Sequence, residues 1–276
     1  RSDKLQEHIQ FLYSHGALYK TLNGNLMFHG CIPFTEDGEF RDVTINGITQ
    51  HGAKLMEYLD KELRDAYFNP PKGKTRAEAA NLMWYLWLGP DSPLFGKDKM
   101  TTFERLFIAD KATHKEHVVP YYRLINQKDI CVKMIRDFGL DASHGKILNG
   151  HVPVKIKDGE SPIKGGGMLY VIDGGISKAY QKTTGIAGYT FIFNSRFMAL
   201  SEHQPYQPLR PDGTQEFNNP VIQTVYTLPQ RMLIVDTDNG KAIREQIDDL
   251  EQLLQAYRKG SIKRQGCQGS RYATHF

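Results

Sequence analysis

Two histidines stand where short apolar runs give way to turns. In 26-LMFHGCIP-33 and 147-ILNGHVP-153, His29 and His151 each adjoin a glycine, and a proline follows within four positions. Both runs are typical of strand ends, and the carboxyl ends of parallel strands meet at one edge of a sheet, where ligand sites form. Neutral imidazole is a common ligand of Mn, Fe and Zn. One such histidine alone is more often structural, but two in matching contexts favour a metal-ligand pair.

Cationic side chains gather in the long loop 89-GPDSPLFGKDKMTTFER-105. Lys97, Lys99 and Arg105 stand there beside Thr101 and Thr102. Arginine and lysine supply the donors that phosphate oxygens need. The alternative interpretation is a surface arginine on a short helix together with solvated lysines.

Three further patterns are weaker. Lys155 and Lys164 flank an acidic turn and could line a sugar-phosphate pocket, although solvated lysines are the common case. The run 164-KGGGM-168 departs from the GxxxxGK[ST] phosphate loop and precedes a strand, so it predicts a hairpin-like turn. His114 and His117 could share a metal on a helix, but their polar context favours a phosphate-binding or surface role.

Composition limits the class of protein. The 276 residues are 40% hydrophobic, which is enough chain for one large domain or two small ones. A net charge of +4 gives no reason to propose nucleic acid as a partner. The charged start of the chain and the lack of an apolar run of about 18 residues predict neither a signal peptide nor a membrane span. Cys31, Cys131 and Cys267 are too far apart for a zinc site of the CxxC type, and their odd number favours a reducing, cytoplasmic location.

Periodicity predicts a mixed α/β chain. Helices are expected at 3–15, 51–69, 75–89, 129–140 and 240–260, and strands at 25–30, 146–151, 167–175, 187–194, 221–229 and 231–237. Trp84 and Trp87 are expected in the core. The helix at 240–260 should present an apolar face, and residues 261–276 form a tail without periodicity, either mobile or foreign to the native chain.

Longer words carry a family resemblance. NLMFHGCIPFTEDGEF, WYLWLGPDSPLFGKDKMTTFER, NGHVPVK, GESPIKGGGMLYVIDGGISKAYQKTTGIAGYT and LLQAYRKG occur in this order between about residues 3 and 263. They resemble the class III, Firmicutes-type fructose-1,6-bisphosphatase. That family is similar to the calcineurin-like metallophosphoesterases, whose α/β sandwich with flanking helices binds two divalent metals. The resemblance implies that His29 of the HG word and His151 of the GH word are metal ligands, with Mn expected ahead of Mg or Fe.

The chain departs from the superfamily in one respect. Metallophosphoesterases also have an Asp-x-His word, a Gly-Asp-x-x-x-Arg-Gly word and a Gly-Asn-His word before the HG word, and none occurs here. Two histidines cannot hold two ions, because each ion takes about four to six donors. Residues 1–260 are therefore interpreted as the C-terminal part of a metallophosphoesterase domain that needs an N-terminal half of the same protein. The alternatives are a truncated chain and a non-catalytic fragment.

The same resemblance assigns the remaining roles. By analogy with the related phosphoprotein phosphatases, Arg105 would contact phosphate, and Asp91 would orient a ligand histidine or arginine, unless it only forms a turn. The substrate-binding candidates are Lys97, Lys99, Asn149 and Lys155.

The expected function is hydrolysis of fructose 1,6-bisphosphate to fructose 6-phosphate and phosphate, in gluconeogenesis, by a homo-oligomer. In the complete site two divalent ions would activate water and neutralise developing charge. The alternatives are a phosphoprotein phosphatase and a non-catalytic module that binds phosphorylated metabolites.

Overall fold

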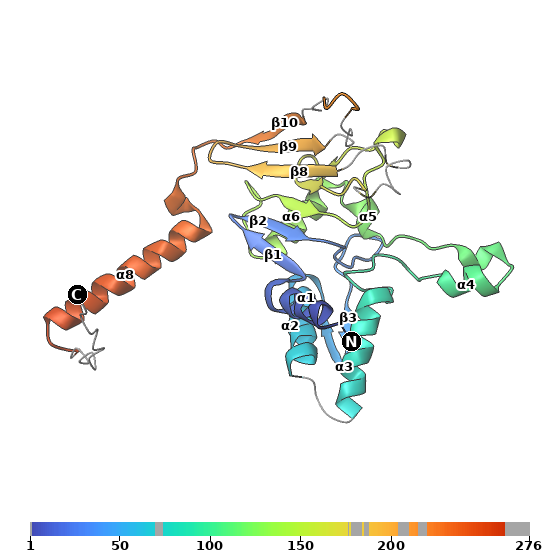
Figure 1. The fold of residues 1–276 in the computed structure, drawn as a ribbon, viewed down its shortest axis with the longest axis horizontal. Coiled ribbons are helices and arrows are strands. Elements are labelled where there is room, and N and C mark those ends of the chain that lie inside the picture. Colours follow the sequence, from blue (N-terminus) through green and yellow to red (C-terminus); the bar gives the residue numbers. More distant parts are fainter. Residues whose placement is uncertain are drawn as a thin grey trace. The chain divides into compact units, whose positions relative to one another are not determined.

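A computed structural model shows the architecture of the chain (Figure 1). It describes residues 2–69, 74–175, 177, 184, 188–203, 210–214 and 220–262. The chain divides into two compact units, Arg1–Pro229 and Gln230–Phe276. The prediction that residues 1–260 form part of one domain is not tested by this division and stays a prediction.

A five-stranded sheet forms the centre of the first unit. Its strands, in spatial order, are β1 (Tyr19–Leu22), β2 (Asn25–Phe28), β5 (Ile147–Asn149), β7 (Leu169–Val171) and β6 (Ile163–Lys164). β2, β5 and β7 run parallel, while β1 and β6 pair antiparallel at the two edges. The three parallel strands therefore end at the same edge of the sheet, as their apolar runs predicted.

The central strands are held in register by their buried side chains. Leu26 pairs with Ile147, which in turn pairs with Leu169, and all three are fully buried. A slip of one residue would turn these side chains to the opposite face, so burial fixes where each strand ends. The predicted hairpin-like turn at 164–168 is confirmed, because it joins β6 to β7.

Helices and 3-10 turns make up much of the rest of the first unit. They are α1 (Asp3–His15), α2 (Gly52–Phe68), α3 (Lys74–Leu88), α4 (Thr102–Phe107), α5 (Tyr121–Leu124) and α6 (Lys128–Asp137), with 3-10 turns η1 (Lys111–His114) and η2 (Ile156–Asp158). The carboxylate of Asp137 in α6 accepts a hydrogen bond of 2.6 Å from the amide of Ala53 and thereby caps α2. Gly52 has a φ of +52°, and a Cβ there would lie 2.2 Å from that carboxylate, so the cap requires glycine.

Two smaller sheets complete the first unit. β8 (Gly188–Phe193), β9 (Phe197–His203) and β10 (Val221–Thr227) form an antiparallel sheet, and β3 (Val43–Ile45) pairs with β4 (Ile48–Gln50). The rings of Tyr170 in β7 and Phe191 in β8 lie 5.0 Å apart, which joins the three-stranded sheet to the central one. The expected mixed α/β class with flanking helices is confirmed.

The second unit consists of the 3-10 turn η3 (Ile234–Asp236) and the helix α8 (Asp238–Arg258). The helix expected at 240–260 is confirmed. The strand expected at 231–237 is wrong, because this segment forms η3, whose Asp236 carboxylate accepts a hydrogen bond from the amide of Leu233. Of the tail expected at 261–276, residues 263–276 lie outside the described part of the chain.

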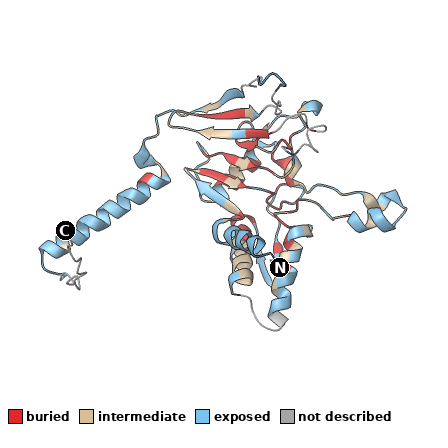
Figure 2. Cartoon of the chain, in the orientation of Figure 1, coloured by how far each residue is buried: buried red, intermediate tan, exposed pale blue. Residues whose placement is uncertain are grey.

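Burial corrects one further expectation (Figure 2). Trp84 and Trp87 of α3 are 57% and 61% exposed and contact each other edge to face, so their placement in the core is wrong. The buried side of α3 carries Leu82 and Leu86 instead. Among the described residues, no helix is long and apolar enough to cross a membrane.

Candidate metal-ligand pair

The two histidines converge at the carboxyl ends of β2 and β5. His29 directly follows β2, and His151 lies two residues beyond β5. Nε2 of His29 is 3.2 Å from Nδ1 of His151, and the two rings meet edge to face at 85°. The prediction that parallel strands bring these histidines together is confirmed. Their role as metal ligands stays a prediction.

A buried amide holds the turn that carries His29. Asn149, the last residue of β5, is 2% exposed. Its Nδ2 donates to the carbonyl oxygens of Phe28, His29 and Gly30 at 3.3, 3.0 and 2.8 Å. These bonds give Asn149 a structural role in fixing the HG turn. The substrate contact expected of it stays a prediction.

Close packing explains the glycine of the HG word. A Cβ at Gly30 would lie 1.9 Å from the carbonyl oxygen of Pro93, and that oxygen accepts a hydrogen bond of 2.8 Å from the amide of Cys31. Only glycine lets the loop after α3 pack directly on the HG turn. The loop that follows the tryptophans therefore supports His29 from one side, while Asn149 supports it from the other.

The proton of His151 is placed by a backbone carbonyl. Nε2 of His151 lies 3.0 Å from the carbonyl oxygen of Phe95. A carbonyl oxygen can only accept, so Nε2 carries the proton and Nδ1 presents a lone pair to His29. His151 also has a φ of +69°, a conformation uncommon for residues other than glycine. The sharp turn after Gly150 aims the ring back across the strand ends.

Burial and charge favour the neutral form of the His29 imidazole. Partial burial lowers its pKa, and the neighbouring His151 lowers it further, while the carboxylate of Asp173 opposes both effects. A neutral imidazole is the form that binds a metal. The arrangement thus favours the protonation state that a ligand needs.

Asp173 is a residue of this site that sequence reasoning missed. It lies just beyond β7, the third parallel strand, and its Oδ1 accepts a hydrogen bond of 2.8 Å from the amide of Gly175. The sequence could have indicated Asp173. In 167-GMLYVIDGG-175 an apolar run ends at a polar residue beside a glycine, as it does at His29 and at His151. Asp173, His29 and Lys20 line a pocket of about 590 Å³ beside the strand ends.

In the loop from 89 to 105, Asp91 and Lys97 form separate ion pairs. The Asp91 carboxylate accepts from Nε of Arg41 at 2.6 Å. This is the kind of arginine partner that was expected of it, although Arg41 itself was not predicted. Lys97 pairs with Glu116 at 2.7 Å, and Lys99 is exposed.

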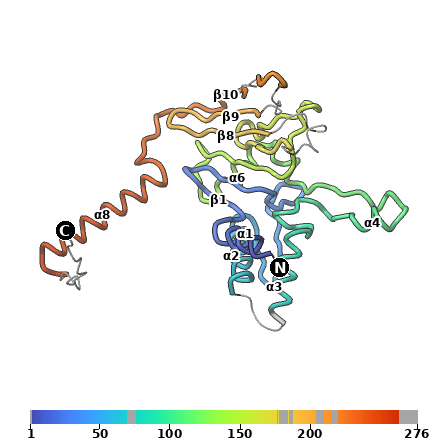
Figure 3. Tube along the Cα trace, in the orientation of Figure 1, coloured from blue at the N-terminus to red at the C-terminus, as the bar shows by residue number. Residues whose placement is uncertain are grey.

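Arg105 lies on α4, in an arm that projects from the central sheet (Figures 1 and 3). Its Nε donates to the hydroxyl of Thr101 at 3.0 Å, and its Nη2 donates to the carbonyl of His114 at 3.1 Å. The structure does not bring Arg105, Lys97 or Lys99 to the histidine pair. Their contacts with phosphate stay predictions.

The remaining candidates are also dispersed. Lys155 is exposed, and Lys164 forms an ion pair of 2.8 Å with Glu160. His114 ends η1, whereas His117 lies outside the helix and pairs with Asp98 at 2.9 Å. Because η1 stops before His117, the helical i, i+3 arrangement considered for a shared metal is not formed.

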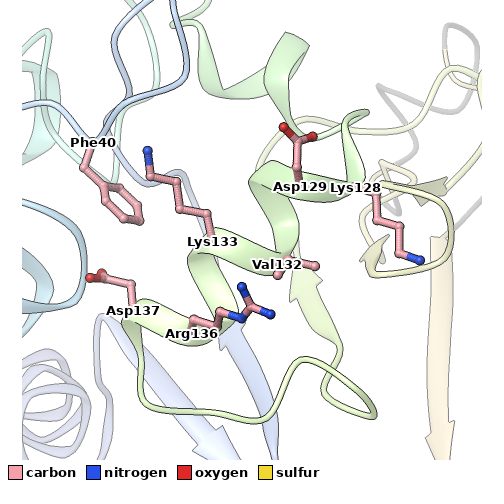
Figure 4. Close-up of a pocket in the computed structure, with 7 residues that line it drawn as sticks. All are labelled: Phe40, Lys128, Asp129, Val132, Lys133, Arg136 and Asp137. Atoms are coloured by element: carbon pink, nitrogen blue, oxygen red, sulfur yellow. The ribbon is translucent and has the colours of Figure 1, made fainter.

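A second hollow, of about 830 Å³, lies along α6 (Figure 4), and neither histidine of the pair lines it. Its charged lining consists of Lys128, Asp129, Lys133, Arg136 and Asp137. The Lys133 ammonium pairs with Glu39 at 2.5 Å, and Asp137 caps α2. These contacts stabilise the fold, and we assign the hollow no chemistry.

The histidine pair fits part of a metal site. Two nitrogens bound to one ion at about 2.0–2.1 Å in tetrahedral geometry stand about 3.3 Å apart, close to the separation of 3.2 Å between His29 and His151. Within the part of the chain that the structure describes, however, no group of three or more His, Cys, Asp or Glu side chains could hold a metal. The residues present therefore fit two ligands of one ion.

Comparison with known proteins gives the family. The protein-family model described as Firmicute fructose-1,6-bisphosphatase matches residues 1–259. The chain is 49% identical over 265 residues to the protein named fructose-1,6-bisphosphatase class 3 of Clostridium botulinum strain Kyoto / Type A2, covering 95% of this chain and 39% of that protein. It is 46% identical to the protein of the same name from Clostridium novyi strain NT, covering 96% of this chain and 40% of that protein.

These comparisons also set limits. The chain spans about two fifths of the length of these curated relatives. No solved structure matches it, so its membership of the metallophosphoesterase superfamily stays a prediction. The match across nearly the whole chain, which includes both histidine words, shows that this chain belongs to the Firmicute fructose-1,6-bisphosphatase family.

Proposed function

We propose that this chain is part of a metal-dependent phosphatase that hydrolyses fructose 1,6-bisphosphate to fructose 6-phosphate and phosphate. The name of the relatives supports the substrate. The observation that carries the chemistry is the pair His29 and His151, whose ring nitrogens face each other at 3.2 Å across the ends of two parallel strands. Carbohydrate metabolism, and within it gluconeogenesis, is the corresponding role.

His29 and His151 would hold one divalent ion, with Mn preferred over Mg or Fe, in a site of two ions. When bound, the ions supply Lewis acidity, which activates water and neutralises charge at the phosphoryl group. The chain itself orients the two ligands. The Phe95 carbonyl keeps the proton of His151 on Nε2, and Asn149 fixes the turn that carries His29.

The pocket beside His29 is the proposed place for the sugar. Its volume of about 590 Å³ lies within the range of about 300–1,000 Å³ typical of small-molecule sites. Lys20 lines it and offers a cation to a phosphate group, while Asp173 offers a carboxylate to sugar hydroxyls. Neither residue was among the substrate-binding candidates from the sequence.

The remaining ligands would come from the rest of a longer polypeptide. The relatives are about two and a half times as long as this chain, since it covers 39% of their length. We propose that this additional length supplies the bridging carboxylate and the general acid. It would also cover the exposed apolar side chains of α1 and α3, which include Phe11, Leu12, Trp84 and Trp87.

The test is phosphate release from fructose 1,6-bisphosphate by the protein at the full length of its relatives, with and without Mn²⁺. His151→Ala should lower kcat by about a hundredfold or more, because loss even of a group that only orients a metal ligand commonly costs about 10–100-fold. The matched control is His144→Ala, which removes an exposed histidine outside α1 and α3. Equal turnover of the two variants would refute the ligand role.

The assay also separates the alternatives. Release of phosphate from phosphopeptides but not from the bisphosphate would select a phosphoprotein phosphatase. Binding of the bisphosphate without Mn²⁺, and no hydrolysis after Mn²⁺ is added, would select a metabolite-binding module.

We further propose a cytoplasmic location. Cys31 and Cys131 are free thiols, both buried, and burial raises the pKa of each to about 12. Free thiols are usual in reducing compartments, and thiols with such raised pKa values are inert.

A further inference from the structure

The helix α8 carries a row of regularly spaced apolar side chains, which we call the seam. Its apolar side chains recur at intervals of four, three, four and three residues, namely Ile243, Ile247, Leu250, Leu254 and Tyr257. This alternation is the 3.5-residue repeat of a coiled coil, with Ile247 and Leu254 at a positions and the other three at d positions. Their exposed fractions run from 44% to 64%.

Within its own unit, little of α8 is covered. η3 packs on its first turn, where a Cβ at Gly240 would lie 1.8 Å from the carbonyl of Ile234. Gly240 occupies the a position that precedes Ile243, so the seam begins just after the contact with η3. Figure 2 shows the rest of the helix as exposed along nearly its full length.

We propose that α8 pairs antiparallel with α8 of a second copy of this chain. In an antiparallel pair each a residue faces a d residue of the other helix. If Ile247 faces Leu250, then Leu254 faces Ile243, and the two-fold symmetry repeats both contacts. Four layers form, and Tyr257 then lies opposite Gly240, next to the exposed side chain of Ile234 of the other copy.

The charges beside the seam select this arrangement. Arg244, Glu251 and Arg258 occupy the e positions. In the antiparallel register above, Arg244 faces Glu251 of the other copy, and symmetry gives this ion pair twice. In a parallel pair the e positions would face g positions, which hold Asn239, Gln246 and Leu253, so no opposite charges would meet.

The g positions agree with the same register. Leu253 would face Gln246 of the other copy, and Leu253 is 42% exposed. It adds apolar surface to one side of the seam, while the ion pairs border the other side. A helix of 21 residues gives a short interface, so the association should depend on protein concentration.

The oligomeric state of the 276-residue chain tests the proposal, by sedimentation equilibrium over a hundredfold range of concentration. The parent chain should form dimers. Leu250→Asp combined with Leu254→Asp should raise the dissociation constant at least a hundredfold. Gln252→Asp combined with Gln255→Asp, on the opposite face of the same helix, is the matched control and should dimerise like the parent.

Exchange of the charges at positions 244 and 251 tests the antiparallel orientation of the two helices and leaves the apolar side chains of the seam unchanged. Arg244→Glu and Glu251→Arg should each raise the dissociation constant about tenfold, and the double variant should restore the parent value. A chain that stays monomeric at every concentration would overturn the proposal. Dimers whose stability ignores the charge exchange would overturn the antiparallel register, and circular dichroism would show that the exchange variants keep their helix content.

Discussion

At the scale of residues, the site depends on groups that do not themselves react. The Phe95 carbonyl settles which nitrogen of His151 is free, and the Asn149 amide binds three carbonyls of the turn that carries His29. If the Phe95 carbonyl or the Asn149 amide were lost, both histidines would still be present, but their rings would be free to change orientation. Ligand geometry would then be lost without loss of a ligand.

Removal of the Asn149 amide should therefore cost stability as well as geometry. Asn149→Ala removes hydrogen bonds to the carbonyl oxygens of Phe28, His29 and Gly30, of which that of His29 keeps a bond from the Gly150 amide. We expect the free energy of unfolding to fall by about 2–4 kcal/mol. Urea denaturation of the chain measures this change. Asn126→Ala, which removes one exposed bond to the Arg123 carbonyl, should change it by less than about 0.5 kcal/mol. A similar effect of the two substitutions would contradict the structural role of Asn149.

At the scale of elements, Glu116 joins the two ends of the arm that contains α4. Its carboxylate accepts from Lys97 Nζ at 2.7 Å and from the amide and hydroxyl of Thr101 at 3.0 Å each. The hydrogen bond from Lys97 and those from Thr101 lower the pKa of Glu116 to about 2. Thr101 in turn accepts from Arg105, so the arm is organised around one carboxylate.

This network predicts a dependence of stability on pH. The folded pKa is below the usual 4.5, so the stabilisation is complete above pH 4.5 and is lost as the pH falls through about 2. Protection of the Thr101 amide from hydrogen exchange should fall in this window. Glu116→Gln should remove the dependence and cost about 1 kcal/mol. An unchanged pH profile in this variant would show that another group is responsible.

The sequence predicted helices with apolar periodicity better than strands that depend on pairing with other strands. Helices at 3–15, 51–69 and 129–140 follow from apolar periodicity, which is a local property, and they agree with α1, α2 and α6. β1, β3, β4, β6 and β9 were missed. β1 is mostly exposed along YKTL, so it lacks the apolar signal of a strand and owes its conformation to pairing with β2.

The site could be predicted in part, because the apolar runs that indicate strands also indicate where those strands end. Parallel strands with matching ends placed His29 and His151 together, because strand direction alone brings such ends to one edge. The roles predicted for Asp91 and Arg105 came from the family resemblance alone. Loop packing determines the partners that the structure gives them, Arg41 and Thr101. Loop packing has no period, so no pattern in the sequence indicated it.

At the scale of the whole molecule, apolar side chains remain exposed on α1, α3 and α8. Trp84 and Trp87 are the two tryptophans of the sequence, and they are adjacent on α3. Large exposed apolar patches commonly mark surfaces that contact other protein. For α8 the seam of five residues favours a second copy, whereas in α1 the same spacing covers only Leu5, Ile9 and Leu12.

In a protein of the relatives' length, we expect the additional length to cover α3. Fluorine NMR of chains labelled with 5-fluorotryptophan reports solvent contact at each site, through the shift between H₂O and D₂O. In the 276-residue chain both resonances should show this shift, since Trp84 and Trp87 are 57% and 61% exposed. In the full-length protein both should lose most of it, with Trp84→Phe and Trp87→Phe used to assign the signals. An undiminished shift would mean that α3 faces solvent in the complete protein.

The three carbonyls that converge on the Asn149 amide also set a limit on the chemical lifetime of the site. Asn149 precedes Gly150, and asparagine followed by glycine is prone to spontaneous deamidation whenever its backbone is free to move. In the folded chain the amide is buried and engaged, which protects it. A chain that spends time unfolded would acquire an isoaspartate or an aspartate there, and the new carboxylate would repel the same carbonyls on refolding. Such ageing would be irreversible, and the damaged molecules would keep both histidines while failing to align them.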